Sequence, residues 1–343
     1  MRTEIQNNLR SFQIDFLRFI GLLLIVLAHV GAPYYIVQLR CFDVPLMVIV
    51  SALCFKPNQG SLHKYWIRRL KRLYYPTFIF LCLYFSLICI VKIIGINVPY
   101  SIEQIIGTFL LLEKPSIGYV WIIRVFILMA FVAPFIYLLV EKTSAWCALL
   151  IMFMMYGILE FLVKIEIESG IIVRFVFNEF IIYALGYSII LASGFWMKRF
   201  SGLYPRLSSY IGLLILIILI CYMLIKKEIP PISQVYKYPP HGLYIIYGIT
   251  IYLCLNLITF NNSVQNIFKK SISLVSSNSL WIYFWHIPFV VLLNSLQVFN
   301  NLWLVKWFVA FVFAIAIASA QVWCVKRFYS QNPNLNWLKY LIS

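Results

Sequence analysis

The chain has 343 residues, of which 63% are hydrophobic and 11% are charged, and its mean hydropathy is +0.91. Soluble globular domains are nearer half apolar and a quarter charged, so this composition excludes a soluble enzyme and a disordered protein. The net charge of +17 would suggest nucleic-acid binding in a soluble protein. In a membrane protein basic residues mark cytoplasmic loops and contact anionic headgroups, so we expect membrane lipids and no nucleic acid as partners.

Ten apolar stretches follow one another along the chain, and a membrane span needs about 20 such residues. The sequence therefore predicts an all-α, polytopic transmembrane helix bundle of about ten helices. It is predicted to form one domain over 1–343 without a soluble extracytoplasmic domain. The predicted spans are 12–30, 42–56, 73–96, 119–140, 144–164, 172–194, 208–225, 242–260, 276–299 and 302–325.

The segments between these stretches predict the orientation. Residues 98–115 contain Glu103, Glu113 and two prolines, which favours a partly amphipathic external stretch instead of a span. Lysine and arginine are more frequent in the segments on the N-terminal side of the membrane, so both termini are predicted to be cytoplasmic. The eight cysteines form no CxxC motif and mostly lie in apolar stretches, so we expect neither disulfides nor a metal site.

The first stretch carries ionisable residues, which are expensive in a membrane and usually face a bundle interior or an aqueous cavity. Arg18 and His29 are 11 residues apart, about three helical turns, so a continuous helix would place them on nearly the same face. Asp15 lies one turn before Arg18. This pattern favours Arg18 and His29 as catalytic candidates. The alternative is an Asp15–Arg18 pair that reaches the interface and a histidine among the headgroups.

The second stretch has Asp43 as its second residue, which a helix running inward would place at the level of His29. A carboxylate beside an imidazole fixes its tautomer and raises its basicity, as a general base requires. The alternative is a helix start, because an acidic residue followed by Pro45 suits the first helical turn. Both roles are compatible.

The predicted cytoplasmic loop from His63 to Arg72 holds five cations within nine residues. Arginine binds phosphate through a bidentate fork, so Arg68, Arg69 and Arg72 are predicted to hold a polyphosphate ligand. The alternative is an anchor on anionic lipid.

His286 lies near the middle of the ninth stretch, two residues before Pro288. It is a second candidate for acid–base chemistry or donor contact, and the alternative is a packing residue among aromatic side chains.

The predicted external rim combines Glu160, Glu179 and Arg124 with the proline-rich loop 228–241 and with Glu166 and Glu168. Carboxylates and aromatic rings suit sugar hydroxyls, so this rim is the candidate acceptor site. The alternative is an ordinary polar rim with a stiff connector.

Taken in order, these residues resemble the acyltransferase-3 family of integral membrane acyltransferases over about 10–330. Arg18 and His29 match its Arg-x10-His signature, and Phe42–Leu46 with Ser51 is similar to its second-helix motif, although Ser51-Ala52 stands where the family has Ser-Gly. Arg69 and Arg72 with Pro76 resemble its Arg-x-x-Arg segment. Trp121 resembles the tryptophan that opens its fourth helix, although Trp121-Ile122-Ile123 replaces Trp-Phe-Leu. Tyr283 to His286 with Pro288 matches a late aromatic-His-x-Pro element.

The resemblance implies transfer of an acyl group, usually acetyl, from acetyl-CoA to a hydroxyl of a cell-envelope sugar in the bacterial cytoplasmic membrane. Arg68, Arg69 and Arg72 would bind the CoA phosphates, and His29, oriented by Asp43, would act as general base or pass the acyl group. Arg18 would stabilise negative charge or bind donor phosphate, His286 would assist, and Trp121 would join the acceptor site. Acyl-CoA is then a co-substrate and no cofactor stays bound.

The implied partners are an envelope glycan or lipid-linked sugar and, in addition, a second copy of the chain or polysaccharide-assembly proteins. The alternative function is a transporter or flippase, for which intramembrane Arg and His would line a path. That function would predict inverted repeats, and the sequence shows none.

Overall fold

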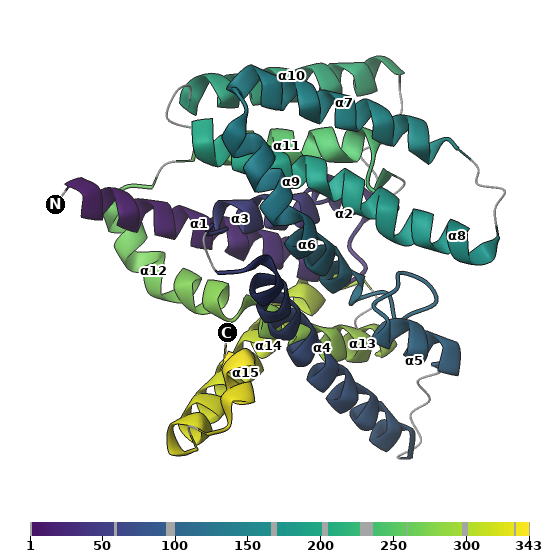
Figure 1. The fold of residues 1–343 in the computed structure, drawn as a ribbon. Coiled ribbons are helices and arrows are strands. Elements are labelled where there is room, and N and C mark those ends of the chain that lie inside the picture. Colours follow the sequence, from purple (N-terminus) through teal and green to yellow (C-terminus); the bar gives the residue numbers. More distant parts are fainter. Residues whose placement is uncertain are drawn as a thin grey trace. The chain divides into compact units, whose positions relative to one another are not determined.

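The computed structural model describes residues 2–57, 60–93, 100–165, 170–200, 205–226, 236–258, 260–296, 301–332 and 334–342. These residues are predominantly helical and contain no β-strand, which confirms the predicted all-α fold (Figure 1). The helices are α1 (Arg2–Leu27), α2 (Tyr34–Leu39), α3 (Asp43–Leu53), α4 (Leu62–Ile93), α5 (Ile102–Phe109), α6 (Trp121–Lys142), α7 (Ala145–Val163), α8 (Ile171–Val176), the π-helix η1 (Phe177–Ile182), α9 (Tyr183–Phe200), α10 (Pro205–Lys226), α11 (Gly242–Leu255), α12 (Asn262–Ser277), α13 (Ser279–Ser295), α14 (Trp303–Gln331), the 3-10 turn η4 (Asn336–Leu338) and α15 (Lys339–Ile342).

Each of the ten predicted stretches overlaps a helix. Among the residues that the structure describes, six helical segments could cross a membrane by length and composition: Tyr34–Leu53, Leu62–Ile90, Trp121–Lys142, Ala145–Val163, Val173–Phe200 and Trp303–Gln331. The helices α11 and α13 are apolar but shorter. The count of ten spans and the cytoplasmic termini stay predictions.

Two helical boundaries next to candidate site residues differ from the prediction. The segment from His63 to Arg72 is the first part of α4 and not a loop, because its Leu, Arg and Lys residues favour helix and no breaker interrupts them. At the other boundary, α1 ends at Leu27 and His29 lies in the turn that follows. Gly31 in that turn has a φ of 71°, a left-handed conformation that glycine adopts readily, and Pro33 follows it.

The described residues group into two compact units, the first formed by 1–28, 32–58 and 128–273. Within this unit α3 contacts α1, α9 and α11, and eight of its 11 residues are buried. Glycines permit this approach. A Cβ added to Gly248 of α11 would lie 2.3 Å from Cβ of Pro45, and one added to Gly194 of α9 would lie 2.7 Å from Cβ of Ala52.

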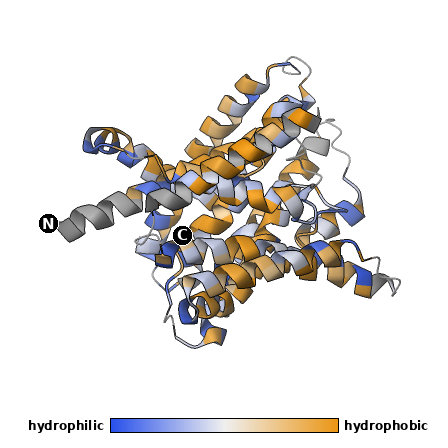
Figure 2. Ribbon diagram, turned by 90° about the horizontal axis from the view of Figure 1, so that it is seen from above, coloured by the Kyte–Doolittle hydropathy of each residue, from blue (hydrophilic) through white to orange (hydrophobic). Residues whose placement is uncertain are grey.

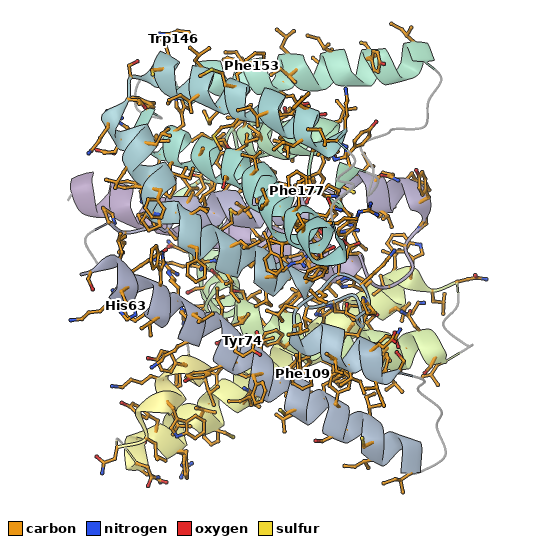
Figure 3. All side chains as sticks on the ribbon, turned by 45° about the vertical axis from the view of Figure 1, so that its right-hand side comes forward. His63, Tyr74, Phe109, Trp146, Phe153 and Phe177 are labelled. Carbon is orange, nitrogen blue, oxygen red and sulfur yellow. The ribbon has the colours of Figure 1, made fainter. Side chains whose placement is uncertain are left out.

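The same unit presents apolar side chains outward, as a lipid-facing protein requires. Trp146 and Phe153 are two turns apart on α7 and are 81% and 72% exposed (Figure 3). Apolar residues extend over most helices, with hydrophilic residues concentrated near helix ends and connections (Figure 2). This distribution fits a multi-pass membrane protein.

The second unit is formed by 29–31, 59–127 and 274–343. Here α13 packs along α14 and also contacts α4, while α15 contacts α4 and α14. The rings of Phe80 and Phe284 stack with centroids 4.9 Å apart. Two tryptophans of α13 form hydrogen bonds through their indole nitrogens. Trp281 Nε1 donates to Leu341 O at 2.8 Å, and Trp285 Nε1 donates to Gln321 Oε1 at 2.5 Å. These bonds fix the rotation of α13, which carries His286.

Candidate active site

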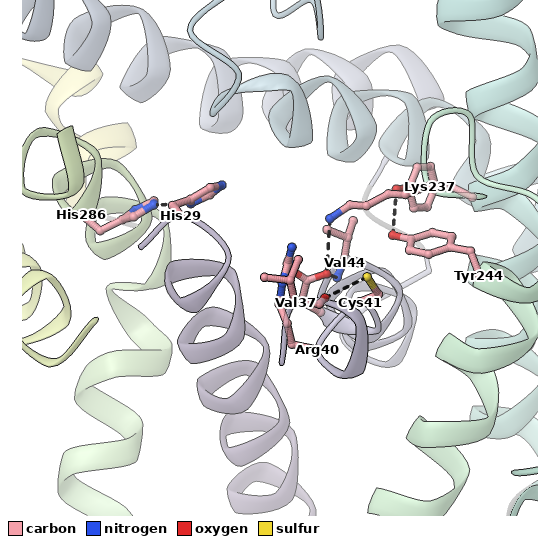
Figure 4. Close-up of polar contacts among 10 residues, drawn as sticks. His29, Val37, Arg40, Cys41, Val44, Lys237, Tyr244 and His286 are labelled. Atoms are coloured by element: carbon pink, nitrogen blue, oxygen red, sulfur yellow. Dashed lines mark hydrogen bonds and ion pairs between the residues drawn. The ribbon is translucent and has the colours of Figure 1, made fainter. Parts of the chain in front are cut away.

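Two histidines that are far apart in the sequence meet in the second unit. His29 Nδ1 lies 3.0 Å from His286 Nε2 (Figure 4). Their rings stack at 18° with centroids 5.2 Å apart. His286 is fully buried and His29 is half-buried. The structure thus brings together the two histidines that were separate catalytic candidates.

The hydrogen bonds of this pair define its tautomers. His286 Nδ1 contacts the carbonyl oxygen of Tyr283, and a carbonyl oxygen can only accept. For two neutral rings, His286 Nδ1 therefore carries a proton and its Nε2 accepts from His29 Nδ1–H. The lone pair of His29 then lies on Nε2, where a general base needs it. In a catalytic triad a carboxylate holds the base histidine in this same tautomer by accepting its Nδ1–H, so the contact with His286 is compatible with the predicted catalytic roles of the two histidines.

Tyr119, in the connection before α6, completes an aromatic wall at this pair. Its ring meets the ring of His29 edge-on, with centroids 4.8 Å apart. The hydroxyl of Tyr283 donates to the carbonyl oxygen of Tyr119 and so ties this connection to α13. Burial, with a smaller contribution from Tyr100, raises the pKa of Tyr119 to about 12. Its phenol therefore stays protonated at neutral pH.

The backbone of His29 is also held. Asn294 Nδ2 on α13 donates to His29 O at 3.1 Å, and Lys306 Nζ on α14 donates to Asn294 Oδ1 at 2.8 Å. Sequence reasoning missed Asn294 and Lys306. The one sequence feature that could have drawn attention to this pair is the position of Lys306, a lysine at the start of an apolar helix.

Asp43 lies in the first unit, in a buried charge cluster with Arg40 and Lys237. Figure 4 labels these two cations. Asp43 Oδ2 is 2.5 Å from Arg40 Nη1 and Asp43 Oδ1 is 3.6 Å from Lys237 Nζ. Burial lowers the pKa of Lys237, although the Asp43 carboxylate acts in the opposite direction. Neither cation was a candidate residue, although Arg40 and Asp43 have the i, i+3 spacing of a helical ion pair.

The helix-start interpretation of Asp43 is confirmed. Asp43 is the first residue of α3, and its Oδ1 accepts from the backbone N–H of Val44 at 2.8 Å. A carboxylate at this end also complements the helix dipole. The orientation of His29 by Asp43 concerns residues of different units and stays a prediction.

Arg18 lies on α1 in the first unit and pairs with Asp15 at 3.7 Å. Arg18 Nη2 also contacts Cys54 Sγ at 3.2 Å. Both charged side chains are about one quarter exposed, at 26% for Arg18 and 28% for Asp15. The predicted Asp15–Arg18 pair is therefore present.

The three candidate phosphate ligands lie on the first part of α4, in the second unit. Arg68 and Arg72 are exposed, and Arg69 is half-buried with its guanidinium carbon 5.5 Å from the ring centroid of Tyr65. Because Arg69 and Arg72 are three residues apart on one helix, they lie on one face of α4 and could hold adjacent phosphates.

The candidate acceptor residues divide between the units. Trp121 and Arg124, at the start of α6, belong to the second unit and are 5% and 3% exposed. In the first unit, Glu160 Oε1 accepts from the backbone N–H of Gly242 at 2.6 Å, where α11 begins, which gives it a capping role. Glu179 lies in the π-helix. Glu166, Glu168 and residues 228–235 of the proposed rim lie outside the described residues.

The sequence model of an acyltransferase domain, Acyl_transf_3, matches residues 12–323. The match includes His29, His286 and the arginines of α4. No curated protein and no solved structure matches the chain.

Proposed function

Because the chain belongs to the Acyl_transf_3 family of acyltransferases, we propose that it moves an acyl group, typically acetyl, from acyl-CoA to a hydroxyl of a cell-surface sugar or polysaccharide precursor. The observation that carries the proposal is the His29–His286 pair, with a 3.0 Å contact between Nδ1 and Nε2. It leaves a base on His29 Nε2 beside the aromatic wall of Tyr119 and Tyr283.

The proposed reaction is a direct transfer. His29 Nε2 takes the proton of the acceptor hydroxyl, and the hydroxyl oxygen bonds to the carbonyl carbon of the thioester. The carbonyl electron pair moves to its oxygen and then returns as the C–S bond breaks. The released CoA sulfur receives the proton from His29. The products are the sugar ester and the free thiol, and His29 returns to its starting state.

The donor side of the proposal rests on charge. CoA carries several phosphates, and arginine forks bind phosphate better than lysine does. Arg68 and Arg72 are exposed on α4, so they are accessible to a soluble donor. Arg18 is proposed to contact a donor phosphate as well. Trp121, Arg124, Glu160 and Glu179 stay proposed acceptor contacts.

Comparison of envelope polysaccharide from cells with and without the chain tests the function. Mass spectrometry should show one added acyl group per modified residue only when the chain is present. His29→Ala should abolish this mass increase while the protein still accumulates in the membrane, because general acid–base catalysis contributes about 10²–10⁴-fold. Retention of more than about a tenth of the acylation would exclude His29 as the base. Equal acylation in both cells, with altered glycan export, would favour a transporter.

The side from which the acceptor arrives has its own test. Lys114 and Lys142 are both exposed, and the predicted orientation places them outside and inside, respectively. A membrane-impermeant thiol reagent should label Lys114→Cys in intact cells and Lys142→Cys only after permeabilisation. The unmodified protein, with its eight cysteines, provides the background. The reverse pattern would move the acceptor site to the cytoplasm.

A further inference from the structure

A buried ammonium group lies next to the histidine pair without a carboxylate partner among the described residues. Lys306 is the fourth residue of α14 and is 5% exposed. Its Nζ donates to Asn294 Oδ1 at 2.8 Å. The ion pairs found in the described part of the chain involve other cations.

This position is unfavourable for a cation in two ways. Removing an ammonium from water is strongly unfavourable unless an opposite charge compensates. The start of a helix also carries a partial positive charge, and no side chain caps the start of α14, whose N-cap is Leu302. A neutral donor would make the bond to Asn294 equally well, so that bond alone does not account for a lysine.

The ammonium is directed to the turn that carries His29. A Cβ added to Gly31 would lie 3.7 Å from Lys306 Nζ. Asn294 bridges the same groups, since its Nδ2 donates to His29 O at 3.1 Å. All four residues belong to the second unit. An ammonium has three N–H donors, and the described residues supply one hydrogen-bond acceptor, Asn294 Oδ1.

We propose that Lys306 binds a negatively charged oxygen of the substrates beside His29. This proposal rests on the proposed acyl transfer. Two groups have the required chemistry. One is the carbonyl oxygen of the thioester, which becomes negative when the acceptor hydroxyl bonds to the carbonyl carbon and the π electron pair moves to oxygen. The other is a carboxylate or phosphate on the acceptor sugar.

The experiment uses the full chain, purified in detergent, with acetyl-CoA as donor and two matched acceptors. These are p-nitrophenyl β-glucoside, which is neutral, and p-nitrophenyl β-glucuronide, which carries a carboxylate. Lys306→Met removes the charge, and Lys306→Arg keeps it. Lys326→Met is the matched control, because Lys326 is an exposed residue of the same helix.

If Lys306 stabilises the carbonyl oxygen, Lys306→Met lowers kcat about 10²-fold with both acceptors. If it binds an acceptor carboxylate, KM for the glucuronide rises about tenfold and the glucoside is unaffected. In either case Lys306→Arg retains more activity than Lys306→Met, and Lys326→Met matches the unmodified protein. Values of kcat and KM within twofold of the unmodified protein for both acceptors would overturn the proposal. Equal losses in Lys306→Met and Lys306→Arg would do the same.

A second variant covers a failure of Lys306→Met to fold. Asn294→Asp places a carboxylate at the atom that now lies 2.8 Å from the ammonium, so the charge is neutralised in place. We expect the same kinetic losses. Asn294→Leu is the control for this variant, because it also removes the hydrogen bond from Asn294 Nδ2 to His29 O but adds no charge. Full activity of Asn294→Asp would overturn the proposal for Lys306 while the proposed function stood. Equal acylation of envelope polysaccharide in cells with and without the chain would overturn both.

Discussion

Replacing His286 should separate its effect on the tautomer of His29 from its effect on packing. His286→Leu removes the acceptor for His29 Nδ1–H, which is 3.0 Å away. An unsatisfied, partly buried N–H costs about 1–3 kcal/mol, which corresponds to roughly 5–150-fold. A predominantly wrong tautomer costs up to about 10⁴-fold in the serine protease example. We therefore expect kcat to fall at least tenfold.

His286→Gln is the matched variant, because the amide oxygen of Gln can occupy the place of Nε2 and accept the same proton. It should retain kcat within about fivefold, since one hydrogen bond of similar net strength remains. The assay follows thiol release from acetyl-CoA at saturating acceptor. The donor KM should be unchanged in both variants, because donor binding is assigned to the arginines of α4.

Two results would refute this reasoning. A kcat for His286→Leu within threefold of the unmodified protein would show that His29 needs no acceptor at Nδ1. Equal losses for His286→Leu and His286→Gln, with equal losses of thermal stability, would show that His286 acts through packing.

Three further predictions follow from the charges and close contacts. Replacing Arg69 and Arg72 together with Gln should raise the donor KM at least tenfold, because a hydrogen bond to a charged group contributes about 1.5–3 kcal/mol. The acceptor KM should not change, and failure of the variant to insert would show that the cations serve topology only. Asp43→Asn should lower the free energy of unfolding by about 3–5 kcal/mol, because it removes the buried carboxylate that Arg40 and Lys237 face. A loss below 1 kcal/mol in denaturant titrations in detergent would contradict this. Gly248→Ala should destabilise the protein by about 1–3 kcal/mol, because the added Cβ would overlap Pro45. Gly157→Ala on α7 should instead stabilise the protein by about 0.5–1 kcal/mol, because a Cβ there meets nothing within 4 Å. Thermal melting of the two alanine variants against the unmodified protein checks both signs.

The fold class followed from sequence alone because hydropathy and helical propensity are local properties. Each predicted apolar stretch overlaps a helix, since a chain in a bilayer must satisfy its backbone hydrogen bonds within each segment. The family resemblance was also readable, because its motifs are short and keep their order, and the match over 12–323 confirms it.

Local signals were less reliable at helix ends. The cationic segment before Leu73 was predicted to be a loop from its charge, yet it is helix, since Lys and Arg are good helix formers. His29 was placed by extending α1, although Gly31 and Pro33 already indicated that the helix stops early.

Only the tertiary structure decided which charged and aromatic residues meet. His29 and His286 are 257 residues apart, and no sequence pattern around either histidine indicates that the other lies beside it. The same holds for Lys237 and Asp43, and for Asn294 beside His29. Helical periodicity places a side chain on a face of its own helix, whereas a contact between distant helices depends on how they rotate and pack. That rotation is set by bonds such as those from Trp281 and Trp285, which exist only in the folded chain.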